Sequence, residues 1–237
     1  LKDKLRNINN NNSQSINELI EICIKFGTMP FAKLARHAFI GTTLIKSLHS
    51  EGILSSSRLS EYFSSIKTVL SEMIEDVHKL KDKSLNIINF NQKYGHLRPG
   101  TYDITSKSYR EIDAVELFGD REINISNKSF NFTNKELIKT NKLINKYNLP
   151  FADSLEFLNY VTKSIQARER SKFEFTKLID FIFKRIKNIS KVYSITIDDL
   201  SYLSIDKLVL IEKNKYSCDK KDIIKDIKIN KIQHRIH

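Results

Sequence analysis

The sequence predicts an all-α fold: an elongated multi-helix domain with long amphipathic helices and one long ordered loop at about residues 95–120. Three observations predict it. Only three prolines and six glycines interrupt the 237 residues. Apolar residues recur at three- and four-residue spacings, while the alternation typical of strands is hard to find. Several of these segments also open with a Ser or Thr that can cap a helix.

Composition sets the class of protein. Hydrophobic residues make up 40% and charged residues 29%, a globular balance. No stretch reaches eighteen apolar residues, so we expect no membrane span. Cys23 and Cys218 are too isolated for a disulfide framework or a thiolate metal site, which favours a cytoplasmic location. The first residue is Leu and the end is abrupt, so we expect a fragment of a longer polypeptide.

The chain is strongly basic, with a net charge of +12 and a pI near 9.5. Such a balance can serve nucleic acid, anionic lipid or phosphorylated ligands. The abundance of Lys, Ile and Asn also fits an AT-rich coding bias that places lysines on solvated faces. Basic residues are spread over many segments rather than gathered on one helix. A nucleic-acid partner is therefore not favoured.

In the first half, a helix is expected over residues 15–26, with Ser15 as its N-cap. Gly27 should end it, and Pro30 should lie in the first turn of the next helix. The next helix, residues 31–48, is apolar nearly all round and should be buried. Residues 57–81 follow a four-three spacing that predicts one long amphipathic helix. A shorter helix from about residue 84 should end at Gly95.

In the second half, Thr133 with Glu136 forms a capping-box pattern that opens a helix over residues 133–147. A very long helix is expected over residues 154–189, followed by short helices at 196–203 and 205–213. The end of the chain alternates Ile with Lys and Asp and could be a helix or a frayed element. The expected organisation is a mobile polar end (1–14), a helical central domain (15–213) and an Ile/Lys-rich tail (214–237).

The predicted loop at about residues 95–120 contains the first candidate site. It gathers His96, Arg98, Tyr102, Asp103 and Thr105 within ten residues. Arg can clamp an anion with two hydrogen bonds, and His or Asp can take a proton from a hydroxyl. The alternative is a structural loop whose polar groups cap adjacent helix ends.

Two further clusters stand out. Arg168 and Lys172 interrupt the apolar seam of the long helix, where a charge is costly unless it is paired. They could face an anion-binding cavity, pair with acids such as Asp103, or lie where the seam is exposed. Arg36 and its neighbours begin the second helix, where backbone N–H groups favour anions.

Several well-known sites are missing from the sequence. It contains no Walker-type phosphate loop, kinase signature, GxGxxG or HExxH motif, and its six histidines show no metal-ligand spacing. We therefore expect no metal site.

The segment Lys93-Tyr94-Gly95-His96-Leu97-Arg98-Pro99-Gly100-Thr101-Tyr102-Asp103-Ile104 resembles the helical region of phosphoenolpyruvate-synthase-like proteins, relatives of pyruvate phosphate dikinase. It is similar, more loosely, to a loop in the drug-binding domain of rifampin phosphotransferase. Residues 26–32, 35–40, 167–173 and 198–205 resemble other segments of the same region. Together they span about residues 26–208.

The resemblance implies an ATP-dependent phosphotransferase as the parent protein. There an ATP-grasp domain uses ATP and Mg, and a swivelling phosphohistidine domain carries the phosphate to an acceptor. The helical domain would bind an anionic or hydroxylated small-molecule acceptor, or scaffold the swivelling domain. This sequence contains neither flanking domain, so it should not be catalytic alone and should need no cofactor of its own.

Phosphoryl transfer depends mainly on positioning and positive charge, so the matched positions receive expected roles. His96 or Asp103 would accept the hydroxyl proton. The expected substrate-binding residues are Arg36, Tyr94, Arg98, Tyr102, Thr105, Arg168 and Lys172. The loop should then lie against the Arg168 and Lys172 interruption.

Two alternatives remain open. One is a structural helical linker or interaction domain without a ligand site, which mutual burial of these charges as ion pairs would favour. The other is a basic nucleic-acid-binding helical protein, which strong salt-dependent retention would favour.

Overall fold

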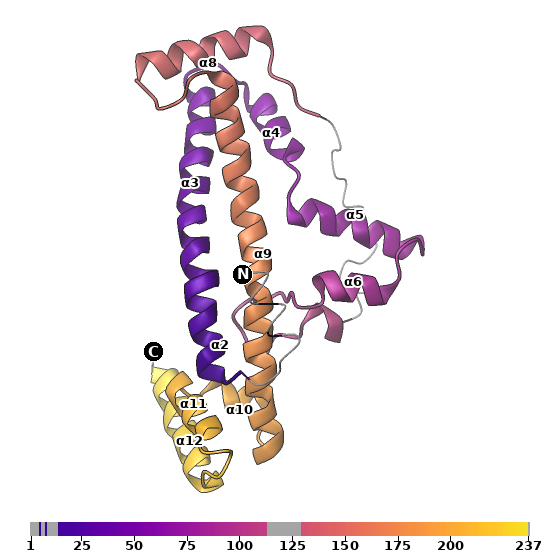
Figure 1. The fold of residues 1–237 in the computed structure, drawn as a ribbon, viewed down its shortest axis with the longest axis vertical. Helices are drawn as coiled ribbons and strands as arrows, with labels where there is room; N and C mark the ends of the chain where they lie inside the picture. The colour runs from indigo at the N-terminus through magenta and orange to yellow at the C-terminus, as the bar shows by residue number, and fades with distance from the viewer. Residues whose placement is uncertain (1–4, 6–7, 9–13, 113–128, 237) are drawn as a thin grey trace. The chain divides into compact units, whose positions relative to one another are not determined.

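The computed structural model describes Leu5, Ile8, residues 14–112 and residues 129–236, and this part of the chain is helical with no strand (Figure 1). The all-α prediction is confirmed. The chain divides into two compact units. Unit 1 comprises Leu1–Thr28, Ile88–Leu117 and Glu174–His237, and unit 2 comprises Met29–Ile87 and Phe118–Phe173. The domain boundaries expected from the sequence remain predictions.

Helix α9 (Ser154–Tyr193) contributes to both units. The other elements of unit 1 are α2 (Ile16–Cys23), η1 (Ile24–Thr28), α6 (Ile87–Tyr94), η2 (Tyr109–Glu111), α10 (Ile197–Ser201), α11 (Ile205–Lys213) and α12 (Lys220–Ile236). Those of unit 2 are α3 (Met29–Ser50), α4 (Ser56–Ser65), α5 (Val69–Lys81) and α8 (Asn134–Lys146).

The predicted caps form, but the break after the first helix does not. Ser15 caps α2 and forms a capping box with Glu18. Beyond Cys23 the backbone continues through the π-helix η1 into α3, so the predicted end at residue 26 is wrong. Pro30 is the second residue of α3 and directly follows η1, so the residue without an N–H lies where the π-helical hydrogen-bond pattern gives way to the α-helical one.

Helix α3 is not buried all round, which corrects a second prediction. Phe39 and Ile40 are 60% and 50% exposed. The buried face instead carries Ala35, Ala38 and Gly41, followed by Ile45 and Leu48. Small residues let a second helix approach closely, and α9 does so at Gly41, where a Cβ atom would lie 2.5 Å from Ser164 Oγ and 3.3 Å from Val161 Cα.

The single helix predicted over residues 57–81 is wrong, because α4 and α5 are separate. Ile66 leaves α4 with an extended backbone, and Thr68 caps α5 in a capping box with Ser71. The break is held from outside, since Gln166 of α9 donates to the Lys67 carbonyl at 3.1 Å. The four-three spacing continues across the break, and Leu70 of that seam is 56% exposed.

The later elements follow the prediction closely. Thr133 and Glu136 form their capping box, residues 205–213 form α11, and α9 runs four residues beyond the expected end. The end of the chain is a helix, α12, that buries Ile223 and Ile227. Residues 95–112 contain turns and one 3₁₀ segment, as a loop should. Residues 113–120 of the predicted loop lie outside the described residues.

Hydrophobic packing and a polar network hold the elements of the two units. In unit 2 a hydrophobic core forms around α3, α4, α8 and α9, from Ile45, Leu48, Leu54, Tyr62, Ile66, Leu143, Ile144, Phe157, Leu158 and Val161. In unit 1, Glu212 of α11 accepts from the Ile16 N–H at 2.5 Å and from Arg185 Nε at 3.0 Å, so one carboxylate connects α2, α9 and α11.

Across the described part of the chain, no helix combines the length and apolar character that a membrane crossing requires.

The α3–α9 contact gives a stability prediction. Gly41→Ala should lower the free energy of unfolding by about 1–3 kcal/mol, because the new methyl group meets Ser164 Oγ and the Val161 backbone. Adding Ser164→Ala removes the closest atom and should recover part of the loss. Urea unfolding followed by circular dichroism measures both. Thr43→Val on the exposed side of α3 is the control, and a loss as large there would contradict the close-packing argument.

Candidate functional site

The loop after α6 is closed on itself by backbone contacts. Tyr94 ends α6, is fully buried and packs against Phe90 at 4.9 Å between ring centres. Leu97 accepts from the Tyr109 N–H at 2.8 Å, and the Gly95 carbonyl accepts from Arg110 Nε at 3.0 Å. The two ends of the loop are therefore held together within unit 1.

Arg98 anchors this loop to α9. Its Nη2 donates to Asp180 Oδ1 at 2.6 Å, and both side chains are about 95% buried. The guanidinium lies over the Phe183 ring at 4.8 Å. Nη1 is buried without a hydrogen-bond partner among the described residues. An arginine enclosed in this way serves first to satisfy a buried carboxylate.

Asp180 is a central residue that sequence reasoning missed. Besides Arg98 it contacts Arg110 Nη2 at 3.2 Å and Lys184 Nζ at 3.0 Å, so three cations surround one carboxylate. A signal was present, because Asp180 is the one charged residue in the run Leu178–Phe183. A carboxylate flanked on both sides by apolar residues of a buried helix requires cations from elsewhere.

Asp103 shapes the exposed turn of the loop. Its carboxylate accepts from the Thr105 N–H at 2.8 Å and from Thr105 Oγ1 at 2.7 Å. The hydroxyl bond, followed by the backbone bond, holds the pKa of Asp103 below its ordinary value. A general base works best with a pKa near the working pH, so this geometry favours a turn-forming role for Asp103 and Thr105.

The other expected site residues are spread over different environments. His96 is 5% exposed, whereas Tyr102 is 66% exposed, so the loop does not direct both into one place. In unit 2, Arg36 is exposed on α3, and Arg168 of α9 lies over the Phe39 ring at 5.3 Å.

Arg168 and Lys172, which interrupt the apolar seam of α9, lie in unit 2 and are only partly buried. Arg168 also lies 3.9 Å from Glu169, and its Nε is buried without a hydrogen-bond partner in the described part of the chain. Lys172 is half-buried. These two residues belong to unit 2 and the loop to unit 1, so the expected contact between them remains a prediction.

Unit 2 contains a ligand-sized cleft that the sequence did not indicate. It has a volume of about 600 Å³ and lies between α4, α5, α9 and residues 129–132. Small-molecule sites usually measure about 300–1,000 Å³. We call it the α4–α9 cleft. Its lining residues combine aromatic, hydroxyl and amide side chains: Tyr62, Ser64, Ser65, Ile66, Lys67, Ser71, Glu75, Ser129, Phe130, Phe132, Leu158, Asn159, Thr162 and Gln166.

Three aromatic rings form one wall of the cleft. Tyr62 meets Phe130 at 5.7 Å and Phe132 at 5.8 Å, and the two phenylalanines meet at 4.8 Å, all edge to face. The Tyr62 hydroxyl pairs with Thr162 Oγ1 at 2.9 Å. Burial raises the pKa of Tyr62 above its ordinary value, so the hydroxyl stays neutral at physiological pH.

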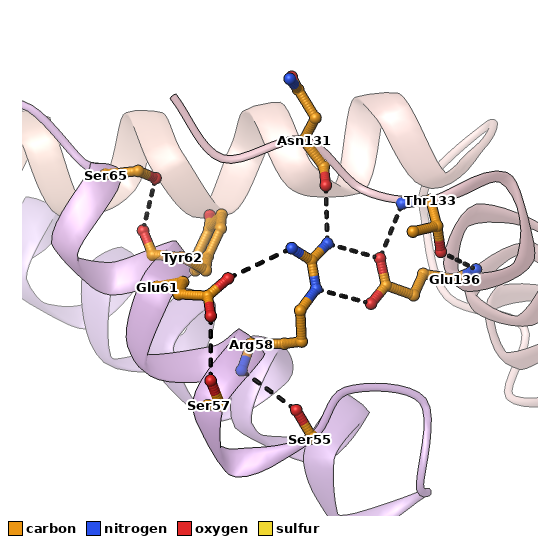
Figure 2. Close-up of polar contacts among 9 residues, drawn as sticks. All are labelled: Ser55, Ser57, Arg58, Glu61, Tyr62, Ser65, Asn131, Thr133 and Glu136. Atoms are coloured by element: carbon orange, nitrogen blue, oxygen red, sulfur yellow. Dashed lines mark hydrogen bonds and ion pairs between the residues drawn. The ribbon is translucent and has the colours of Figure 1, made fainter. Parts of the chain in front are cut away.

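Arg58 of α4 contacts this aromatic wall, and Figure 2 shows its hydrogen bonds to Glu136 and Asn131. Its guanidinium forms a two-bond pair with Glu136, at 3.0 Å and 2.9 Å, and donates to the Asn131 carbonyl at 2.7 Å. The same group stacks on the Phe130 ring at 4.0 Å. The Arg58 hydrogen bond is the main reason why the pKa of Glu136 lies below its ordinary value. The network thus connects α4, α8 and the extended segment that carries Phe130.

The polar groups of the cleft suit an uncharged ligand. Lys67 and Glu75 carry the opposite charges among its described lining residues, so the walls have no net charge. Asn159 is exposed on α9. The side-chain amide of Gln166 donates its N–H to the Lys67 carbonyl, and the Oε1 belongs to the same amide. Among the described residues, no group of three or more His, Cys, Asp or Glu side chains could hold a metal ion.

Comparison with known proteins gives no match. No family model, no curated protein and no solved structure matches this chain. The resemblance to phosphoenolpyruvate-synthase-like proteins therefore depends on the quoted sequence segments alone.

The Arg98–Asp180 pair predicts a large effect from a small change. Asp180→Asn should lower the free energy of unfolding by about 3–5 kcal/mol, because it leaves Arg98 buried without a counter-charge. The double variant Arg98→Met/Asp180→Leu should recover most of that loss. Urea unfolding measures both, with Asp206→Asn on the exposed side of α11 as control. Equal losses in Asp180→Asn and the control would refute the structural role.

The Arg58–Glu136 pair predicts a pH-dependent stability. Because the folded-state pKa of Glu136 is lowered, its contribution is complete above about pH 4.5, the ordinary value, and is lost as the pH falls through the folded-state pKa. Wild type should therefore exceed Glu136→Gln in stability more at pH 6 than at pH 3. Urea unfolding at both pH values tests this. Glu61→Gln, which removes a 3.4 Å contact from a 55% exposed carboxylate, should show a smaller difference.

Proposed function

We propose that this chain is a helical binding domain that holds a small, uncharged, hydroxyl-bearing molecule in the α4–α9 cleft. The observation that carries the proposal is the combination of a ligand-sized cleft, a three-ring aromatic wall and hydroxyl and amide groups on α4, α5 and α9. Apolar ring surface beside hydrogen-bonding groups is what a hydroxylated molecule with one apolar face requires.

The charges of the cleft support a neutral ligand over an anionic one. Lys67 is matched by Glu75, and none of Arg36, Arg98, Arg168 and Lys172 lines the cleft. An anionic acceptor would lose its hydration without gaining an excess of cations. Of the two acceptor classes that the sequence suggested, the hydroxylated one is therefore the better fit.

The sequence resemblance supplies the wider part of the proposal. In a phosphoenolpyruvate-synthase-like phosphotransferase, the bound hydroxyl would be the phosphoryl acceptor, and ATP and Mg would be used by an ATP-grasp domain. The domain described here would bind and orient the acceptor without catalysing the reaction alone. A cytoplasmic location belongs to the same proposal, and the free thiols of Cys23 and Cys218 accord with it.

A second candidate is a structural scaffold without a ligand site. The observation that favours it is the burial of Arg98 with Asp180, since mutual burial of charges is what a structural loop would show. The Asx turn of Asp103 points the same way. Both observations concern unit 1, whereas the cleft lies in unit 2, so the two candidates are tested at different residues.

The chain contains no Trp, which allows a clean optical test of the cleft. Ser64→Trp places one reporter at an exposed lining position of α4. Glucose and adenosine represent neutral hydroxylated ligands, and phosphoenolpyruvate and inorganic phosphate represent anions. We expect a saturable change in Trp fluorescence with a neutral compound and none with the anions.

A matched pair of variants locates the signal. Asn159→Leu removes a hydrogen-bonding group from the cleft and should weaken binding about tenfold. Asn145→Leu makes the same change on the exposed face of α8 and should leave binding unchanged. If no compound gives a saturable change in Trp fluorescence, or if Asn159→Leu binds as tightly as wild type, the cleft is not a binding site and the structural scaffold is the supported function.

A further inference from the structure

Helix α8 carries a row of four lysines on one exposed face. Lys135, Lys139, Lys142 and Lys146 follow a four-three-four spacing, so they stand one above another along the helix. All four are exposed. Figure 1 shows α8 lying across one end of the α3 and α9 pair, with its length open to one side. We call this row the α8 lysine face.

The α8 lysine face has an unusual shortage of acids. Within the described residues, Lys135, Lys139 and Lys142 take part in no ion pair or hydrogen bond of their side chains. Lys146 lies over the Tyr147 ring at 4.8 Å, and the hydroxyl of that tyrosine contacts Glu51 at 3.5 Å. Glu136, the acid of α8 itself, is turned inward and paired with Arg58. Tyr147 and then Glu51 raise the pKa of Lys146, so the positive charge that no neighbouring acid in the described part of the chain offsets lies mainly on Lys135, Lys139 and Lys142.

The helix that presents these lysines is firmly held. Its N-terminus is capped by Thr133, and its inner face buries Thr140, Leu143 and Ile144. Asn141 accepts from the Ser154 N–H at 2.6 Å, which ties the helix to the start of α9. The lysines are thus spaced by a rigid element and do not need to be ordered by a partner.

We propose that the α8 lysine face binds the phosphodiester backbone of nucleic acid without reading its sequence. Charge complementarity selects a polyanion, and lysine is a common contact to backbone phosphates. From Lys135 to Lys146 the helix rises about 16 Å. That length of duplex axis presents about five phosphates on one strand, enough for each lysine to meet one. This inference is independent of the proposed cleft ligand, and it departs from the sequence-based expectation, which did not favour a nucleic-acid partner.

A membrane surface is the less suitable partner for this helix. A helix that lies on a bilayer needs an apolar face to insert. The apolar face of α8 is already packed into unit 2, and on the lysine side Ile138, which is 57% exposed, is the single large apolar side chain within the helix. The observations therefore favour an extended phosphate polymer, and the vesicle measurement below tests the other partner.

The test uses the whole chain and a fluorescein-labelled 20-base-pair duplex of mixed sequence, followed by fluorescence anisotropy from 50 to 200 mM salt. The stripe variant, in which the α8 lysine face is neutralised, carries Lys135→Gln, Lys139→Gln, Lys142→Gln and Lys146→Gln. Since Gln keeps helix propensity and the sites are exposed, the fold should persist in circular dichroism. The matched control makes the same four changes on α12, at Lys220, Lys221, Lys225 and Lys228, which are also exposed.

Four phosphate contacts correspond to a slope of about −3.6 in log affinity against log salt, or roughly a 150-fold loss of affinity across this range. The stripe variant should lose most of that slope, and the control should keep it. Equal losses in both variants, unchanged binding in the stripe variant, or no binding by wild type at 50 mM salt would overturn the proposal. So would binding to phosphatidylserine vesicles that depends on the α8 lysines while the duplex is not bound.

Discussion

The requirement that a buried carboxylate be surrounded by cations organises both units. In unit 1, Asp180 gathers Arg98, Arg110 and Lys184, and by doing so it fixes the loop after α6 to α9. In unit 2, Glu136 pairs with Arg58 and connects α4 to α8. An isolated buried charge costs several kcal/mol, so these elements are held where their cations can reach the acid.

The α4–α9 cleft follows from the second of these pairs. Arg58 satisfies Glu136 and, with its remaining donors and its flat face, holds Asn131 and Phe130. The extended segment therefore stays beside α4, and the break between α4 and α5 leaves space in front of Tyr62. A polar network that stabilises the unit thus also shapes a surface suited to a hydroxylated ligand. Its members need not touch the ligand to influence binding.

Charge is divided between two surfaces of unit 2. The cleft matches Lys67 with Glu75, whereas the α8 lysine face has four cations and no acid of its own helix pointing outward. A neutral site and a strongly basic one call for ligands of different chemistry. Much of the basic charge of the chain remains distributed over other helices, as a coding bias toward lysine would produce. What distinguishes α8 is the alignment of its lysines.

The sequence by itself determined most of the helices, because caps act over three or four residues: Ser15 and Thr133 begin helices where predicted, and α11 begins at residue 205 as expected. The lysine row of α8 is equally local and could have been recognised. Tertiary structure decided the rest. Gln166 of α9 donates to the Lys67 carbonyl in the break between α4 and α5, α9 approaches the buried side of α3 closely at Gly41, and the partner of Arg98 lies 82 residues away. The cleft joins residues 62–75 with residues 129–166, so no local pattern could reveal it. Hydrogen bonds within one turn can be read from sequence, whereas packing and charge pairing between distant segments exist only once the chain has folded.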